Sequence, residues 1–302
     1  MNHIYAIGEA IIDFSKRKTG EYIPQPGGAV ANVSAAVAIL GGKAALISTV
    51  GNDQFGDLLI NTLKEVNVDT SLVYKSKRQT MLAFVSLLNN GERQFSFYRK
   101  YTAEGFLPDV SDKVKFDHDI LHFGSVCLNT THNIRVHEKL IQKNKESGGI
   151  ICFDPNIRLN IWKDHKKMYH VINYFLNMVD LLKVSEEELE LIRPNLSEQN
   201  AINSLLELGI QTIFVTRGSL GASVYTREGN ADVPGYGSKT IDTTGAGDAF
   251  VGSILYKLQL VQEPLISINL EKWKRIVCFA CEKASKSTTE YGAIPSYKAF
   301  HN

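Results

Sequence analysis

The sequence of 302 residues is short of long apolar runs, of excess charge of either sign and of cysteine. No window approaches the run of about 18 apolar residues that predicts a transmembrane helix. The basic side chains number 33 and the acidic ones 32, and no long basic run occurs. We therefore expect neither a membrane nor a nucleic acid as a partner. The opening segment lacks the basic start and the cleavage site of a signal peptide, which favours a cytoplasmic location.

The four cysteines do not form a metal-binding pattern. Cys278 and Cys281 are spaced as C-x-x-C, but their segment has an apolar face at helical spacing. No second pair of cysteines or histidines stands at zinc spacing. We therefore expect these two residues, and Cys127 and Cys152, to be buried, reduced thiols.

Two nucleotide-binding fingerprints are also missing. No G-x-G-x-x-G follows the first predicted strand, residues 3–7. Gly42-Lys43 lacks both the following Ser or Thr and the upstream glycine of a P-loop. The first absence argues against a nicotinamide-dependent dehydrogenase.

The composition that remains, 44% hydrophobic and 22% charged, is typical of a soluble globular protein. From residue 118 onward, apolar runs typical of strands alternate with segments of helical periodicity. This alternation predicts a mostly parallel sheet covered by helices on both faces. We find no internal repeat or linker, so residues 1–302 are expected to form one domain. The predicted strands are 119–124, 149–158, 180–185 and 211–218, and the predicted helices are 131–146, 164–178, 186–192 and 197–208.

The first hundred residues contain a different pattern. Strand-like runs over 71–100, with an N-N-G-E turn at 89–92, predict a β-hairpin inserted in the α/β chain. Together with the run at 10–23, we expect residues 70–102 to form a small β-sheet lid that excludes water from a reaction site. Ahead of the hairpin, the pattern predicts a helix of small residues between Gly27-Gly28 and Gly41-Gly42, a strand at 44–50 and a helix at 54–65.

The stretch 241–250, I-D-T-T-G-A-G-D-A-F, follows the strand-like run 233–242 and leads into an apolar helix. A glycine turn that opens a helix offers free backbone N–H groups to an anion, so Gly245, Ala246 and Gly247 form a candidate anion site. Asp248, in the first helical turn, is a candidate base for a hydroxyl proton. This combination suits phosphoryl transfer to an alcohol. The alternative is a plain turn with a helix-start carboxylate.

Polar residues collect where the predicted strands end, and ligands of open α/β sheets bind beyond the carboxyl ends of strands. These candidates are Asp154, Asn156, Arg158, Lys183, Ser185, Glu188, Thr216, Arg217 and Gly218. Three more polar residues stand in the amino-terminal third. Asp13 could bind a polyol or face water at a sheet edge, Asn32 could bind a hydroxyl or a loop, and Arg99 could clamp a substrate oxygen or be solvated.

Two separated segments resemble the signatures of the ribokinase-like (PfkB) carbohydrate kinases: 27–42, with Gly27-Gly28-x-x-x-Asn32, and 242–250. The resemblance implies a three-layer α/β/α fold with a mostly parallel central sheet and a small β-sheet lid. It also implies a phosphotransferase with an alcohol acceptor, using ATP and Mg²⁺. By this resemblance Asp248 is the catalytic base, Gly245, Ala246 and Gly247 form the anion hole, and Asp13, Gly28 and Asn32 bind the sugar, with Arg99, Asn156 and Arg158 added as substrate-binding candidates.

The resemblance extends to the nucleotide and to metal ions. Glu188 stands in the motif tied to magnesium, where Ser185 replaces the usual Asn. Nucleotide-binding positions are Lys183, Ser185, Thr216, Arg217, Gly218, Gly221, Ala280 and Ala284. A monovalent-cation loop, of the kind that binds potassium, would use Asp242, Thr244, Ser287, Gly292 and Ser296.

Within this family, several segments are more similar to fructokinases than to ribokinases or adenosine kinases. These segments are 8–14, 91–93, 97–99, 154–158 and 183–185. One position differs from the fructokinase pattern: this chain has Ala103-Glu104 where fructokinases tend to carry Ala-Asp. The expected reaction is therefore conversion of D-fructose to fructose 6-phosphate. The alternatives are a 2-keto-3-deoxygluconate kinase, in which Arg99 and Arg158 would face a carboxylate, another sugar kinase, and a catalytically silent sugar- or nucleotide-binding regulator. Many relatives pair lid to lid, so a homodimer through the lid is a further expectation.

Overall fold

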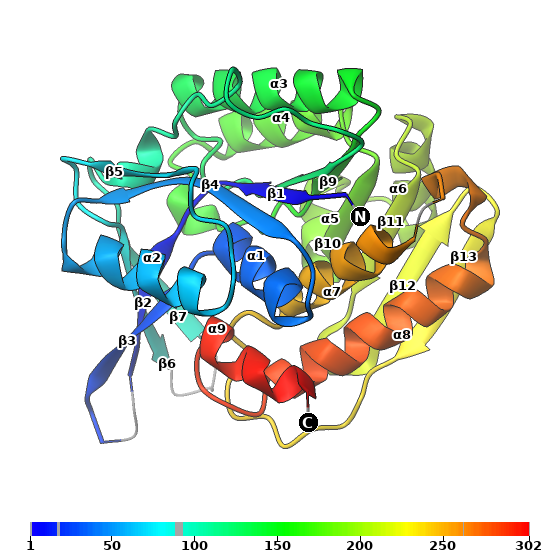
Figure 1. Cartoon of the computed structure of the whole chain (residues 1–302). Helices are drawn as coiled ribbons and strands as arrows, with labels where there is room; N and C mark the ends of the chain where they lie inside the picture. Colours follow the sequence, from blue (N-terminus) through cyan, green and yellow to red (C-terminus); the bar gives the residue numbers. More distant parts are fainter. Residues whose placement is uncertain (1, 17–18, 88–92, 262, 302) are drawn as a thin grey trace.

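The computed structural model describes residues 2–16, 19–87, 93–261 and 263–301. Within them, nine strands form one twisted sheet in the order β13-β12-β11-β10-β9-β8-β1-β4-β5 (Figure 1). Neighbours from β11 to β5 run parallel, whereas β12 and β13 are antiparallel additions at one edge. The strands are β1 (Ile4–Ile7), β4 (Ala44–Gly51), β5 (Val73–Ser76), β8 (Ile120–Phe123), β9 (Ile150–Phe153), β10 (Leu181–Ser185), β11 (Thr212–Thr216), β12 (Gly221–Thr226) and β13 (Gly229–Pro234).

Helices cover both faces of this sheet because its strands carry apolar side chains on both sides. In β9, Ile151 and Phe153 pack into the core under α3 to α6, while Cys152 packs into the opposite core with α7 and α8. Figure 1 shows α3 and α4 above the sheet and α1, α7 and α8 below it. The predicted three-layer α/β/α fold is thus confirmed. The helices are α1 (Ala29–Ile39), α2 (Gln54–Glu65), α3 (Thr131–Glu146), α4 (His165–Leu176), α5 (Glu186–Ile192), α6 (Glu198–Glu207), α7 (Ala246–Leu260), α8 (Leu270–Ser287) and α9 (Ala293–Ser296).

The starts of the helices differ in a way that matters for the site. Helices α2 to α6 and α8 begin at a Ser, Thr, Asp or Asn whose side chain accepts a backbone N–H of the first turn. In contrast, α1 and α7 begin at Gly28 and Gly245, which supply no such acceptor. The first-turn N–H groups of α1 and α7 are therefore left for other partners.

A second, four-stranded sheet stands beside the large one in the order β3-β2-β6-β7, and we call it the lid. Its strands are β2 (Ile11–Lys16), β3 (Tyr22–Gly27), β6 (Leu82–Leu87) and β7 (Arg93–Tyr98). The predicted hairpin corresponds to β6 and β7, although its turn at 89–92 falls in 88–92, outside the described residues.

The lid is smaller than the predicted segment 70–102. Strand β5 does not join it but pairs in parallel with β4 at the edge of the large sheet. The chain there follows β4 closely, since Ser48 donates its N–H to the carbonyl of Leu72. The predicted run 233–242 is also too long, because β13 ends at Pro234 and the chain runs irregularly to the start of α7.

Three further properties of the described part concern membranes, cysteines and metal ions. No helix in these ranges combines the length and apolarity needed to cross a bilayer. All four cysteines are unpaired; Cys127, Cys152 and Cys281 are buried and Cys278 is half-buried. In the same residues, no group of three or more His, Cys, Asp or Glu side chains could hold a metal ion.

Candidate active site

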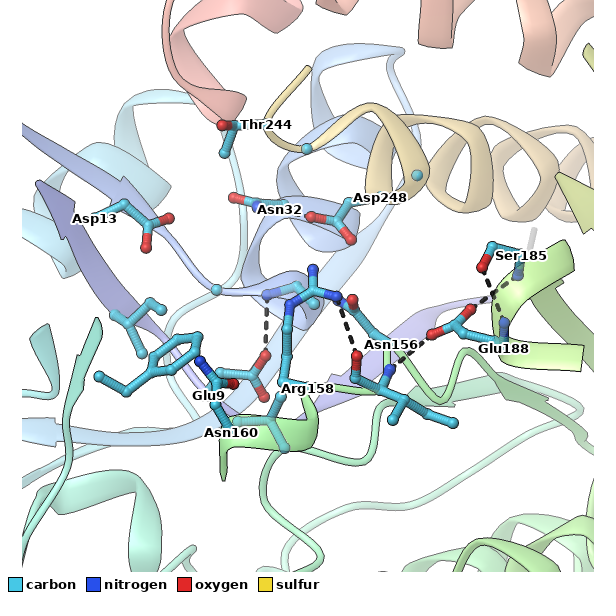
Figure 2. A pocket seen from close by; sticks show the side chains of 18 of the residues that line it. Glu9, Asp13, Asn32, Asn156, Arg158, Asn160, Ser185, Glu188, Thr244 and Asp248 are labelled. Atoms are coloured by element: carbon cyan, nitrogen blue, oxygen red, sulfur yellow. Dashed lines mark hydrogen bonds between the residues drawn. The ribbon is translucent and has the colours of Figure 1, made fainter. Parts of the chain in front are cut away.

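A cavity of about 690 Å³ opens beyond the carboxyl ends of the central strands, between the large sheet and the lid (Figure 2). Most of the predicted site residues line it, although they come from distant parts of the chain. The predicted residues at the cavity are Asp13, Gly28, Asn32, Asn156, Arg158, Lys183, Ser185, Glu188, Thr244, Gly245, Gly247 and Asp248.

The turn before α7 has a conformation and a packing environment that admit only glycine at position 245. Gly245 has a φ of 79°, in the left-handed region. A Cβ there would lie 2.4 Å from the Cβ of Ala293 in α9. The phenolic hydroxyl of Tyr297 donates a hydrogen bond of 2.8 Å to the Gly245 carbonyl oxygen. The carboxy-terminal segment thus holds the turn in place.

The amino terminus of α7 points its first N–H groups at the cavity. The N–H of Ala249 bonds to the carbonyl of Gly245, four residues back, and so begins the helical hydrogen-bond pattern. The N–H groups of Gly247 and Asp248 come before it and have no carbonyl four residues back within the helix. The ammonium group of Lys183 lies beside Gly247, 3.3 Å from the place where a Cβ would be. Backbone N–H groups, the helix dipole and a lysine thus favour an anion at this point.

Asp248 is buried and hydrogen-bonded to the predicted partner helix. The amide nitrogen of Asn32 donates to Asp248 Oδ2 over 2.8 Å, so the alternative that Asn32 bonds a loop backbone is wrong. Burial raises the pKa of Asp248 to about 6, although the Asn32 hydrogen bond lowers it. The two helices approach closely, because a Cβ on Gly252 of α7 would lie 2.6 Å from the Ala36 Cβ of α1.

Two further carboxyl groups, Asp13 and Glu9, line the cavity opposite α7 (Figure 2). Asp13 is 7% exposed, so the alternative of a solvent-facing edge residue is wrong. Burial first, and then the charge of Asp248, raises its pKa to about 7. Glu9 accepts the N–H of Ala29 at the uncapped start of α1, and burial raises its pKa to about 7 as well. At neutral pH this wall therefore holds carboxyl groups close to their titration point.

The loop after β9 carries Arg158 to the cavity. Asp154 accepts the N–H of Asn156, which adopts a φ of 44°. Asn tolerates this left-handed conformation better than most residues. In Figure 2 the guanidinium of Arg158 points up between Glu9 and Asp248. Its positive charge lowers the pKa of both Asp13 and Asp248.

Lys183 and Glu188 form a buried polar cluster at the end of β10. Lys183 lies 3.2 Å from Asp154 and 3.9 Å from Glu188. Burial opposes its charge, but these carboxylates and Asp248 raise the pKa of Lys183 above its usual value. The two oxygens of Glu188 accept the N–H groups of Ile157 and Ser185, at 2.6 and 2.8 Å. Because Ser185 caps α5 in return, Glu188 has a structural role in addition to any role near phosphate.

The predicted nucleotide positions beyond β10 do not line this cavity but continue along the same sheet edge. The Arg217 side chain is held by Glu186, Glu198 and Ser223, at 3.0, 2.5 and 2.6 Å. Gly218 and Gly221 have positive φ values of 53° and 105°, and Thr216 donates to the Val184 carbonyl.

Two predicted nucleotide-binding positions, Ala280 and Ala284, lie on α8. Ala280 is fully buried between α8 and the sheet, so its side chain is not available to a nucleotide. Ala284, one turn further along, is only partly buried.

The predicted cation loop folds around Asp242. This buried carboxylate accepts the N–H groups of Thr244 and Gly292, at 2.8 and 3.0 Å. Its own N–H and that of Ile241 bond to the Thr288 carbonyl. Ser287 and Ser296 are fully buried and donate their hydroxyl protons to carbonyls in their own helices. Their oxygens keep lone pairs, so the donor set is all oxygen and fits a hard cation.

Arg99 is the predicted substrate residue that the structure places elsewhere. It does not line the cavity of Asp248. Its Nη2 lies 3.7 Å from Glu104 and donates to the Val126 carbonyl over 3.3 Å. Glu104 is buried and holds the guanidinium outside this cavity, although the charge of Arg99 still lowers the pKa of Glu9.

Sequence reasoning did not single out Glu9, which lines the cavity, or Tyr297, which bonds to the turn before α7. Glu9 had a usable signal, since it follows the first strand and faces the diglycine at 27–28. Tyr297 had none, because its hydroxyl reaches Gly245 only through the tertiary packing of α9. Other lining residues outside the prediction are Ile11, Ala29, Met81, Phe97, Val126, Ile157, Leu159, Asn160, Glu187, Leu191 and Thr243.

The sequence is similar to that of a known family and its members over nearly its whole length. The model of the pfkB family carbohydrate kinases matches residues 1–299. Probable fructokinase-5 of Arabidopsis thaliana is 35% identical over 308 residues, covering 97% of this chain and 93% of the relative.

Solved structures are similar over the whole chain. A double-mutant fructokinase from Vibrio cholerae O395, in fructose-, ADP- and potassium-bound form, has a TM-score of 0.92 and 32% identity, covering 100% of this chain and 97% of that one. A fructokinase from Xylella fastidiosa with bound ATP has a TM-score of 0.87 and 28% identity, covering 99% and 97%.

Proposed function

Because the chain belongs to the PfkB family of carbohydrate kinases, we propose that it is an ATP-dependent fructokinase that converts D-fructose to fructose 6-phosphate. The family and fructokinase branch predicted from the sequence are thereby confirmed. The observation that carries the mechanism is Asp248: a buried carboxylate, oriented by Asn32, at the helix terminus where an anion is favoured.

In the proposed mechanism the sugar lies between the lid and α7. Asp13 and Asn32 bind its hydroxyl groups, and Arg158 closes the opposite side. Asp248 accepts the proton of the attacking hydroxyl, since its oxygen is fixed at the start of α7. The N–H groups of Gly247 and Asp248, with Lys183, stabilise the charge on the phosphoryl group in transfer.

ATP is proposed to lie along the edge formed by β10, β11 and β12, with its γ-phosphate at the turn 245–247. This places its nucleoside near 216–221 and Ala284, where the chain offers backbone groups and glycine turns. The aligned strand ends support this direction, because parallel sheets bind ligands there. Residues of the lid, among them Asp13 and Phe97, close the cavity over the sugar and exclude water.

Mg²⁺ is expected to be bound mainly by the phosphates of ATP. When bound, it neutralises phosphate charge during the transfer. Both oxygens of Glu188 already accept backbone N–H groups, which supports an indirect contact through water. Mg²⁺ commonly keeps several waters in such sites.

A monovalent cation, K⁺, is proposed for the loop formed by Asp242, Thr244, Ser287, Gly292 and Ser296. The loop is adjacent to the anion turn, since Thr244 precedes Gly245 and Gly292 precedes the Ala293 that packs on Gly245. Its oxygen-only donors support this choice. When bound, the cation would fix the backbone of the turn.

A homodimer through the lid is a further part of the proposal. The outer lid face carries stacked aromatic rings: Phe14 and Phe84 lie 4.8 Å apart, and Tyr98 packs edge-on against Phe84. Tyr98 is 65% exposed, and a second copy would cover this face. Sedimentation should show a dimer that Tyr98→Lys dissociates; a monomer at micromolar concentration contradicts it.

The deciding experiment is a coupled ADP-release assay with ATP-Mg²⁺ and fructose, ribose, glucose, 2-keto-3-deoxygluconate or adenosine. Preference for fructose supports the proposal. Preference for the keto acid would retain Asp248 and the anion turn but assign Arg158 to a carboxylate. No turnover by enzyme that binds ATP would favour a silent regulator.

A further inference from the structure

A second cavity, of about 1240 Å³, adjoins the catalytic cavity near the end of the lid strand β7. It is lined by two parts of the molecule. One is the lid side, with Gln79, Thr80, Leu82 and 96–102, and the other is the body, with Asn129, 160–164 and Lys167. Phe97 and Asn160 line both cavities. A ligand in the second cavity would therefore contact the lid and the body at once.

The charge around this cavity is mostly positive. Its charged lining residues are Arg99, Lys100, Lys163, Lys167 and a single acid, Asp164. That acid is already engaged, because its carboxylate accepts the N–H groups of Lys166 and Lys167 at the start of α4. Within the described ranges, neither Lys100 nor Lys163 takes part in an ion pair. The cavity therefore favours an anion.

Three residues that line this cavity also carry a buried polar atom without a partner. In the described part of the chain, no hydrogen-bond partner exists for Nη1 of Arg99, Nε1 of Trp162 or Oδ1 of Asn129. Trp162 is only 4% exposed. Native proteins rarely leave a buried donor unpaired, so such groups call for an explanation. Two of the three are donors suited to an oxyanion, and the third accepts from a hydroxyl.

We propose that this second cavity binds a sugar phosphate. The phosphate would interact with Lys100 and Lys163 and accept hydrogen bonds from Arg99 and Trp162. A sugar hydroxyl would donate to Asn129 Oδ1, so the sugar would add a contact to those made by the phosphate. Because Lys100 belongs to the lid end and Lys163 to the body, the bound ligand links the two and resists lid opening.

Trp162 provides a local signal for the test. The chain has two tryptophans, and Trp273 is buried in the separate core beneath α8. The enzyme is first saturated with fructose and a non-hydrolysable ATP analogue, so that the catalytic cavity is filled. Glucose 6-phosphate, inorganic phosphate and neutral glucose are then titrated while fluorescence and heat are measured. Trp162→Phe identifies the part of the signal that comes from this cavity.

The expected result is saturable binding of glucose 6-phosphate, weaker binding of inorganic phosphate and none of glucose. The double variant Lys100→Gln/Lys163→Gln should weaken glucose 6-phosphate binding at least about tenfold. It should retain fructose phosphorylation, which shows that it is folded. The matched control is Lys145→Gln/Lys274→Gln, which removes two exposed lysines on α3 and α8 and should bind as wild type.

Three outcomes would overturn the proposal. The first is no saturable binding to the loaded enzyme. The second is equal affinity of the lysine double variant and wild type, or equal weakening in the control. The third is equal affinity for inorganic phosphate and glucose 6-phosphate, which would assign the cavity to free phosphate. Fructose phosphorylation by wild type is measured separately, so a failure of the fructokinase assignment is distinguishable from these three outcomes.

Discussion

The side-chain amide of Asn32 donates a hydrogen bond of 2.8 Å to the carboxylate of Asp248, across 216 positions of sequence. The pair joins α1 and α7, the two long helices that begin at glycine without a side-chain cap. It distinguishes the two oxygens of Asp248, because Oδ2 is occupied by the amide. The remaining oxygen is left to accept a proton from the substrate.

Replacing Asp248 with Asn should reduce kcat for fructose by roughly 10²–10⁴-fold, the usual contribution of a general base. ATP binding, measured by calorimetry, should change little, because the backbone N–H groups remain. Asp112→Asn, an exposed acid far from the cavity, is the matched control. Near-wild-type turnover in Asp248→Asn would remove this residue from the mechanism.

The pH profile of kcat/KM should fall on the acid side. Asp248 must be ionised to accept a proton, and its pKa is raised to about 6 by burial. Activity should therefore decline as the pH falls through about 6. The charge of Asp248 raises the pKa of Asp13, so the two carboxyl groups titrate as a coupled pair. The apparent pKa of the acid limb therefore belongs to the pair and not to Asp248 alone. A flat profile down to pH 4.5 would contradict the assignment.

Asn32→Ala should move that acid limb to higher pH. The amide hydrogen bond lowers the pKa of Asp248, so its loss makes the carboxylate harder to ionise. A merely structural role would lower activity at every pH without moving the limb. The measurement is kcat/KM from pH 5 to 9 for wild type and variant. An unchanged limb would show that Asn32 does not tune the base.

Asp13→Asn should stabilise the folded protein at pH 8 while impairing fructose binding. The pKa of Asp13 is raised to about 7 in the folded state, so the native protein holds this proton more tightly than the unfolded chain. Its ionisation opposes folding, and the cost grows as the pH rises from about 4 to about 7. The stability gain, up to a few kcal/mol in urea unfolding, should shrink towards pH 4. Asp112→Asn is the control, and equal effects in both variants would refute the explanation.

Tyr297→Phe should lower kcat by roughly two- to tenfold, because a lost hydrogen bond costs about 0.5–1.5 kcal/mol. The hydroxyl bonds to the Gly245 carbonyl and does not line the catalytic cavity. We therefore expect the loss in kcat, with KM for fructose nearly unchanged. A change confined to KM would argue against a positioning role at the anion turn.

The sequence predicts those parts of the molecule that depend on local chemistry. The Gly245–Gly247 turn, the following Asp248 and the bounds of α2 and α3 follow from glycine conformation, capping and periodicity. The partner of Arg99, the position of β5 and the role of Tyr297 depend on which segments meet in space. Ala280 illustrates the same limit, since helical spacing places it on the correct helix but does not reveal that it is fully buried.

The pairing of Asn32 with Asp248 also has a consequence for the order in which the protein folds. Contacts between residues far apart in sequence form late, because closing a long loop costs chain entropy before the contact compensates it. The base and its orienting amide lie on helices near opposite ends of the sequence. During refolding from denaturant, helical signal should therefore return before kinase activity. Activity is then a stringent reporter of complete folding, which neither half of the chain can produce alone.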